Sequence, residues 1–256
     1  MDIRFAATRS ADSDTNVYAV MTNGLGLLPG AVADMAGAAG LARFAGECVT
    51  IVESYASIDG QARRVLLLGV GGANDADMEM AGAALTAKLL TSGAKQASVS
   101  FEAAGPVTAN GISRFALGAE LRSWRIDKYR TKLSEKQKPT LEIIELVSGA
   151  DCGAEWARLS AVAQGVRFAR ELVAEPANII YPESFVERCR ALEELGVKLT
   201  ILDESEMAAL GMGALAHRRE ASNTRESFAD WLQRHRQPAA VIERFWEVVL
   251  VSALSE

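Results

Sequence analysis

The 256-residue chain contains 49% hydrophobic and 23% charged residues, an ordinary balance for a folded globular protein. Its formal net charge of −6 argues against broad, non-specific binding to nucleic acid, although it allows a local basic patch. No apolar run approaches membrane-spanning length, and the N-terminus has no apolar signal core. The three cysteines, Cys48, Cys152 and Cys189, are scattered, so we expect free thiols in a cytoplasmic protein.

The first 150 or so residues alternate between predicted strands and helices. The strands are predicted at 2–7, 16–21, 48–54, 64–70, 96–102 and 141–147, and the helices at 31–44 (in part), 78–90 and 107–121. Residues 64–70 are almost all apolar and precede glycines and a helix, which is typical of a buried central parallel strand. Asp59 and Gly60 predict a hairpin turn just before it. The pattern predicts an α/β fold with a mixed sheet.

A long helix from Cys152 or Gly153 to residue 174 leads into a second region. Pro176 ends this helix, and Pro182 stands at the first turn of the next. That second helix is predicted to bury one face, made of Phe185, Val186, Cys189, Leu192 and Leu195. Gly196 ends it, and residues 197–202 alternate as a strand.

The glycines after the central strand are the candidate phosphate loop of the chain: Gly69, Gly71 and Gly72. Glycine there lets a backbone approach a pyrophosphate at a helix N-terminus. However, Asn74 takes the last position of the usual glycine pattern, and acidic residues follow it. A plain strand-to-helix turn is the favoured alternative.

A basic run follows the third helix: Arg130, Lys132, Lys136 and Lys138, with Trp124 and Tyr129 beside it. Such a run could contact phosphates. A solvated loop or a subunit contact is the favoured interpretation.

No residue can be assigned as a metal ligand or nucleophile from spacing alone. The two histidines, His217 and His235, are too far apart to share a helix face. Three acidic residues are close together at a predicted helix start, where carboxylates favour the helix dipole: Asp203, Glu204 and Glu206. Ser184 and Ser205 lack an adjacent base, and Cys189 lies on the apolar face of its helix.

Three segments carry a family resemblance: 65–71 (VLLLGVG), 125–132 (RIDKYRTK) and 168–215. In the last, the matching residues are Arg170, Glu171, Leu172, Val173, Pro176, Ala177, Asn178, Pro182, Glu183, Glu206, Met207, Leu210, Gly211 and Met212. Over about residues 1–215 the chain resembles the leucyl aminopeptidase family, the two-metal cytosolic aminopeptidases (peptidase M17).

The resemblance implies a macro-like N-terminal domain and metal-dependent hydrolysis of N-terminal residues from peptides, with two divalent ions, Mn or Zn. The ligand-bearing NTDAEGR-like segment of that family does not occur in the sequence. We therefore carry over no catalytic or metal-binding residue and expect the chain to be inactive alone. The expected organisation is an N-terminal α/β domain (1–148), a linker helix and hinge (149–181), a truncated start of an α/β catalytic domain (182–215) and a helical tail (216–256).

The tail is predicted to form two amphipathic helices around Pro238. It resembles a fragment of squalene- and phytoene-desaturase-like flavoproteins of the amine-oxidase type, through Ser227, Phe228, Trp231, Leu232, His235, Arg236, Gln237, Phe245, Trp246, Val251, Ser252, Ala253 and Leu254. A non-functional fusion is therefore one alternative. The other is a binding module, for a nucleotide-like ligand or for full-length relatives. Homo-oligomers are possible partners, peptide substrates follow from the family only, and neither a membrane nor nucleic acid is indicated.

Overall fold

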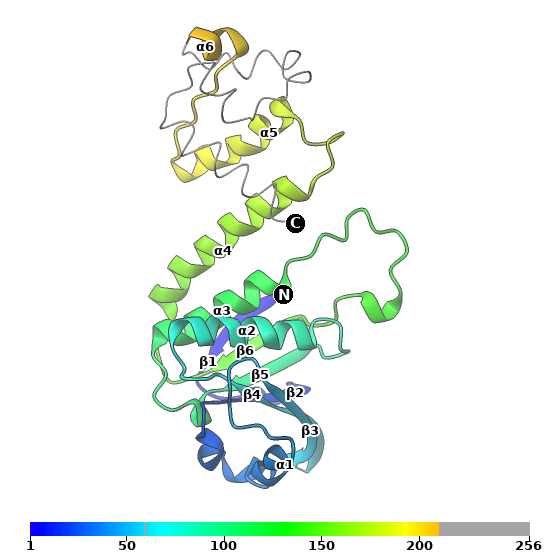
Figure 1. Ribbon diagram of the computed structural model, residues 1–256, viewed down its shortest axis with the longest axis vertical. Coiled ribbons are helices and arrows are strands. Elements are labelled where there is room, and N and C mark those ends of the chain that lie inside the picture. The colour runs from blue at the N-terminus through cyan, green and yellow to red at the C-terminus, as the bar shows by residue number, and fades with distance from the viewer. Residues whose placement is uncertain (59, 210–256) are drawn as a thin grey trace, which may run out of the picture. The chain divides into compact units, whose positions relative to one another are not determined.

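A computed structural model describes residues 1–58 and 60–209 of the chain (Figure 1). It divides into two compact units, Met1–Pro176 and Ala177–Glu256, which we describe separately. Within the described residues, no helix is both long and apolar enough to cross a membrane.

The described part of the first unit is built on a six-stranded sheet in the order β1-β6-β5-β2-β4-β3. The strands are β1 (Asp2–Ala6), β2 (Thr15–Val20), β3 (Ile51–Ile58), β4 (Gln61–Gly69), β5 (Gln96–Ser100) and β6 (Ile143–Val147). Neighbouring strands are parallel, except that β3 and β4 form an antiparallel hairpin in which Ile58 pairs with Gln61. The mixed sheet and the hairpin confirm the sequence prediction, and β1 lies at one edge of the sheet.

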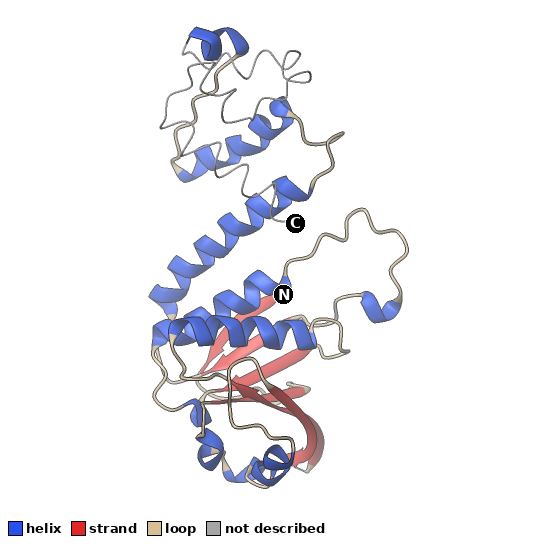
Figure 2. Ribbon diagram, viewed as in Figure 1, coloured by secondary structure: helices blue, strands red, loops and turns tan. Residues whose placement is uncertain are grey.

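Both faces of the sheet are covered at the interior strands β2 and β4, which explains why β4 is apolar without alternation. Successive side chains of β2 and β4 point to opposite faces. On one face Val17, Ala19, Leu66 and Leu68 pack in a core with α2 (Asp75–Leu89) and α3 (Ala109–Ser123). On the other, Tyr18, Val20, Val65 and Leu67 pack with α1 (Met35–Leu41) and residues before it. Figure 2 shows the helices on the two sides of the strands.

The described part of this unit also contains four short 3₁₀ helices: η1 (Gly24–Leu27), η2 (Gly30–Val32), η3 (Glu102–Ala104) and η4 (Glu135–Gln137). The long helix α4 (Gly153–Ala174) follows β6, as the sequence predicts. Leu159 and Ala163 of α4 pack against Leu117 of α3. The helices α2 and α3 approach each other at Gly82 and Gly118, where each glycine faces backbone atoms of the other helix.

The described part of the second unit contains α5 (Pro182–Cys189), η5 (Arg190–Leu195) and α6 (Glu204–Ala209). Pro182 is the first residue of α5, and Gly196 caps η5 with a φ of +83°, both as predicted.

One prediction for this unit is wrong and another holds only in part. The apolar face of α5 and η5 is partly buried, since Val186, Cys189 and Leu192 are half-buried, whereas Phe185 is 46% exposed and Leu195 is 79% exposed. Residues 197–202 form no strand, because the described part of the unit offers no second strand to pair with their backbone groups. The predicted tail helices and both histidines lie outside the described residues.

Candidate functional site

The glycine loop between β4 and α2 is filled by a carboxylate of the chain itself. Asn74 caps α2, since its Oδ1 accepts hydrogen bonds from the backbone N–H groups of Ala76 and Asp77, each at 3.0 Å. The Asp77 side chain then turns back over the loop. Its Oδ2 accepts from the Gly72 N–H at 2.9 Å and from the Asn74 amide at 2.7 Å. A negative group therefore stands where a bound phosphate would have to lie.

The glycines of this loop are explained by close backbone packing. A Cβ at Gly69 would lie 1.9 Å from the carbonyl oxygen of Glu47, and Gly71 has a φ of +57°. The Gly71 N–H donates to the carbonyl of Gly46 at 2.9 Å. Because the N–H groups of Gly71 and Gly72 both have protein acceptors, the geometry favours the strand-to-helix turn over the phosphate loop.

Cys48 lies beside this loop. Its Sγ is 3.4 Å from the backbone oxygen of Asp77. Burial, and secondarily the Asp77 carboxylate, raise the pKa of the Cys48 thiol. The thiol is therefore held protonated, which disfavours a role as nucleophile.

Two of the acidic residues at the start of α6, Asp203 and Glu206, form a helix cap, as predicted. Asp203 Oδ1 accepts from the Glu206 N–H at 2.8 Å and from the Ser205 hydroxyl at 2.7 Å, and Glu206 Oε2 accepts from the Asp203 N–H at 2.9 Å. The hydrogen bonds from Glu206 and then Ser205 lower the pKa of Asp203. These carboxylates stabilise a helix start rather than hold an ion.

The described residues do not fit the two divalent ions that the family resemblance implies. No group of three or more His, Cys, Asp or Glu side chains that could hold a metal occurs among them. Ser184 is also structural, because its hydroxyl donates to the Ile179 carbonyl at 2.8 Å and accepts from the Tyr181 N–H at 2.9 Å. We derive no chemical step from these residues.

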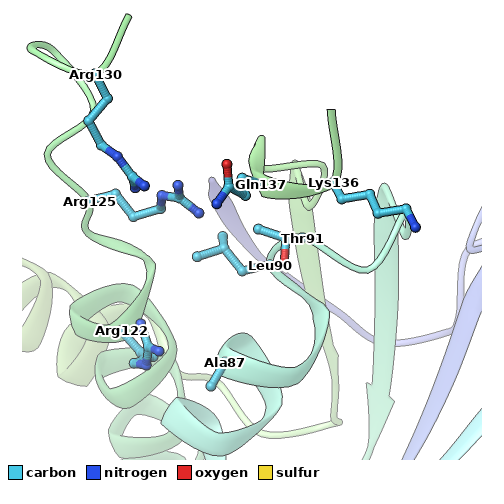
Figure 3. Close-up of a pocket in the computed structure, with 8 residues that line it drawn as sticks. All are labelled: Ala87, Leu90, Thr91, Arg122, Arg125, Arg130, Lys136 and Gln137. Atoms are coloured by element: carbon cyan, nitrogen blue, oxygen red, sulfur yellow. The ribbon is translucent and has the colours of Figure 1, made fainter. Parts of the chain in front are cut away.

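The basic run lies in the connection between α3 and β6, which carries η4 (Figure 2). A hollow of about 380 Å³ opens there, and Figure 3 shows its lining: Ala87, Leu90, Thr91, Arg122, Arg125, Arg130, Lys136 and Gln137. The structure thus brings Arg130 and Lys136 of the predicted run together with two arginines that the sequence analysis did not single out. Lys132 and Lys138 do not line the hollow, and Lys138 pairs with Glu135 at 2.6 Å.

The first residues of the connection between α3 and β6 form hydrogen bonds with the end of α4. Lys128 lies 3.0 Å from Glu175, and the Tyr129 hydroxyl donates to the same carboxylate. The Arg170 guanidinium lies over the Trp124 ring at 5.8 Å and donates to the Leu121 carbonyl at 2.6 Å. Trp124 and Tyr129 therefore hold the loop against α4, which gives them a structural role.

Comparison with known proteins finds two domains of one family in this chain. Residues 38–133 match the N-terminal domain of the cytosol aminopeptidase family, and residues 167–241 match the catalytic domain of the same family. The second match runs into the segment 223–256, which the sequence analysis compares with flavoproteins.

Curated relatives agree with this placement. A probable cytosol aminopeptidase of Sinorhizobium medicae is 38% identical over 198 residues, which cover 72% of this chain and 39% of the relative. One of Caulobacter vibrioides is 38% identical over 160 residues, which cover 60% of this chain and 32% of the relative. The chain thus spans less than two fifths of these relatives.

Solved structures share the fold. A tomato leucine aminopeptidase variant matches with a TM-score of 0.67 at 22% identity, over 83% of this chain and 47% of that one. The bottromycin maturation enzyme BotP in complex with Mn matches with a TM-score of 0.61 at 23% identity, over 79% and 41%. The two successive domain matches and the relatives at 38% identity show that the chain belongs to the cytosol aminopeptidase family.

Proposed function

We propose that the chain supplies the N-terminal domain and part of the catalytic domain of a metal-dependent aminopeptidase that removes N-terminal residues from peptides. The observation that carries this proposal is the succession of two domain matches to one family, at residues 38–133 and 167–241. Peptide substrates, two divalent ions such as Mn or Zn, a homo-oligomeric assembly and a cytoplasmic location belong to the same proposal.

Within this chain we keep 1–148 as the N-terminal domain and 149–181 as the linker helix and hinge. The resemblance of residues 223–256 to flavoproteins stays a prediction. We also propose that residues 1–256 by themselves do not hydrolyse peptides. Support comes from the described residues, which hold no group of donors fit for a metal, and from the lack of an NTDAEGR-like segment in the sequence.

The proposal is tested with purified residues 1–256, loaded with Mn²⁺ or Zn²⁺ and offered a leucine anilide. We expect no hydrolysis above a mock purification from the same host, while a full-length cytosol aminopeptidase of known activity turns the substrate over under the same conditions. Metal-dependent turnover that co-purifies with the chain and exceeds the mock sample would contradict the proposed inactivity.

A further inference from the structure

Four of the eight residues that line the hollow beside the basic run are cations. Arg122 comes from the last turn of α3, Arg125 and Arg130 from the connection after it, and Lys136 from η4. In Figure 3, the guanidinium groups of Arg125 and Arg130 lie near each other and the Gln137 amide faces them, while Lys136 stands at the rim with its ammonium group turned away. The end of α3 and the connection after it therefore place four cations around one cavity, to which α2 and the residues after it contribute only the uncharged Ala87, Leu90 and Thr91.

Only one carboxylate offsets this charge in the described part of the chain. Asp127 lies 2.8 Å from Arg125 Nε and 3.3 Å from an Arg130 terminal nitrogen. Among the described residues, Arg122 and Lys136 have neither an ion pair nor a side-chain hydrogen bond. The two arginines beside Asp127 are held in place, and the remaining two cations are available.

The partial negative charges at the C-terminal ends of the neighbouring helices do not balance all of the positive charge around the hollow. Both α2 and α3 end at the hollow, and a helix C-terminus carries roughly half a negative charge. The end of α2 is already satisfied in part, because the Leu90 carbonyl accepts from the N–H groups of Thr140 at 2.8 Å and Leu141 at 3.4 Å. Of the three arginine charges inside the hollow, Asp127 offsets one and the helix ends about one more, which leaves about one positive charge, with Lys136 at the rim.

We propose that this hollow binds a small, multiply charged phosphate anion of about the size of pyrophosphate. Guanidinium groups suit phosphate because their planar N–H donors match pairs of phosphate oxygens. The volume of about 380 Å³ lies near the lower end of ligand pockets, which suits a small ion rather than a dinucleotide. The Thr91 hydroxyl and the Gln137 amide add neutral hydrogen-bonding groups to the lining. This activity is separate from peptide hydrolysis.

A second hollow is the weaker candidate. It measures about 320 Å³ and lies at the carboxyl ends of parallel strands, where α/β proteins often bind ligands. Its arginine, Arg9, is already engaged by Tyr18, with the guanidinium over the ring at 4.9 Å and a hydrogen bond to the hydroxyl at 2.9 Å. Glu102 also lines it and disfavours an anion.

The test is isothermal titration of the whole chain with sodium pyrophosphate in a low-salt buffer free of divalent metals. We expect one saturable site. Arg122→Gln should weaken binding about tenfold, because it removes a charged hydrogen-bond donor that has no other partner in the described chain. Lys132→Gln is the matched control: it also removes one positive charge, from the neighbouring basic run but outside the hollow, and it should leave the affinity unchanged.

Circular dichroism confirms that each variant is folded before titration. Two results overturn the proposal: no saturable binding at millimolar pyrophosphate, or equal weakening by Arg122→Gln and Lys132→Gln, which would indicate a diffuse positive field. Full affinity in Arg122→Gln combined with Lys136→Ala would also overturn it. Loss of peptidase activity is not a readout here, so this test fails or succeeds independently of the proposed function.

Discussion

The contact between α2 and α3 predicts that one added methyl group in α3 destabilises the first unit. An ideal Cβ at Gly118 would lie 1.8 Å from the carbonyl oxygen of Glu79 in α2, and one at Gly82 would lie 2.0 Å from the carbonyl of Phe115. The two helices thus touch backbone to backbone. Since both obstacles are main-chain atoms of regular helices, no side-chain rotation can make room.

The cost of Gly118→Ala follows from this distance. An ordinary contact is at least 3.4 Å, so the helices must separate by about 1.5 Å at this point. Overpacking of a core costs typically 1–3 kcal/mol, and a rigid backbone obstacle belongs near the top of that range, at about 3 kcal/mol. The better helix propensity of alanine offsets about 1 kcal/mol of this cost. We expect a net loss of about 2 kcal/mol in the free energy of unfolding, or about 4–8 °C in thermal midpoint for a unit of this size.

Gly165→Ala in α4 is the matched control, because a Cβ there meets nothing within 4 Å. The same substitution should stabilise the chain by about 0.5–1 kcal/mol through propensity alone. Urea unfolding followed by circular dichroism measures both variants against the parent. If Gly118→Ala were as stable as the parent, or if both substitutions shifted stability in the same direction, the inferred backbone contact would be wrong.

Two further predictions concern single side chains. Asn74→Ala should lower the unfolding free energy by about 1–2 kcal/mol, since it removes the cap of α2 and a hydrogen-bond donor to Asp77. Asn74→Ser should retain most of the stability of the parent, because serine also caps helices. Equal losses for the two variants in urea titrations would argue against capping. For Glu53, the hydrogen bond from Lys88 and then the pairing with Arg64 lower the pKa. Its stabilisation is therefore complete above the ordinary value of about 4.3 and is lost as pH falls through the lower folded value. The difference in thermal midpoint between the parent and Glu53→Gln should accordingly shrink on acidification, and a constant difference would refute this.

Local sequence signals located most elements of this protein. The apolar run at 64–70, the turn before it and the caps at Pro182, Gly196 and Asp203 act over a few residues, so they could be interpreted without the fold. The apolar spacing of α5 predicts a buried face, which the structure buries only in part, and the alternation at 197–202 predicts a strand, which does not form. Periodicity marks which residues share a face, but burial and strand pairing need a partner layer.

The candidate sites show the same division. The sequence by itself determined that residues 69–72 form a glycine-rich turn and that residues 130–138 are basic. Only the tertiary structure decided that the Asp77 carboxylate fills the turn and that Arg122 and Arg125 join Arg130 and Lys136 around one hollow. The strand order β1-β6-β5-β2-β4-β3 was likewise beyond the sequence. The strand order depends on contacts between residues far apart in the chain. The direction of the Asp77 side chain and the grouping of the cations involve residues close in sequence, but they depend on the three-dimensional path of the backbone, which propensity and capping alone do not define.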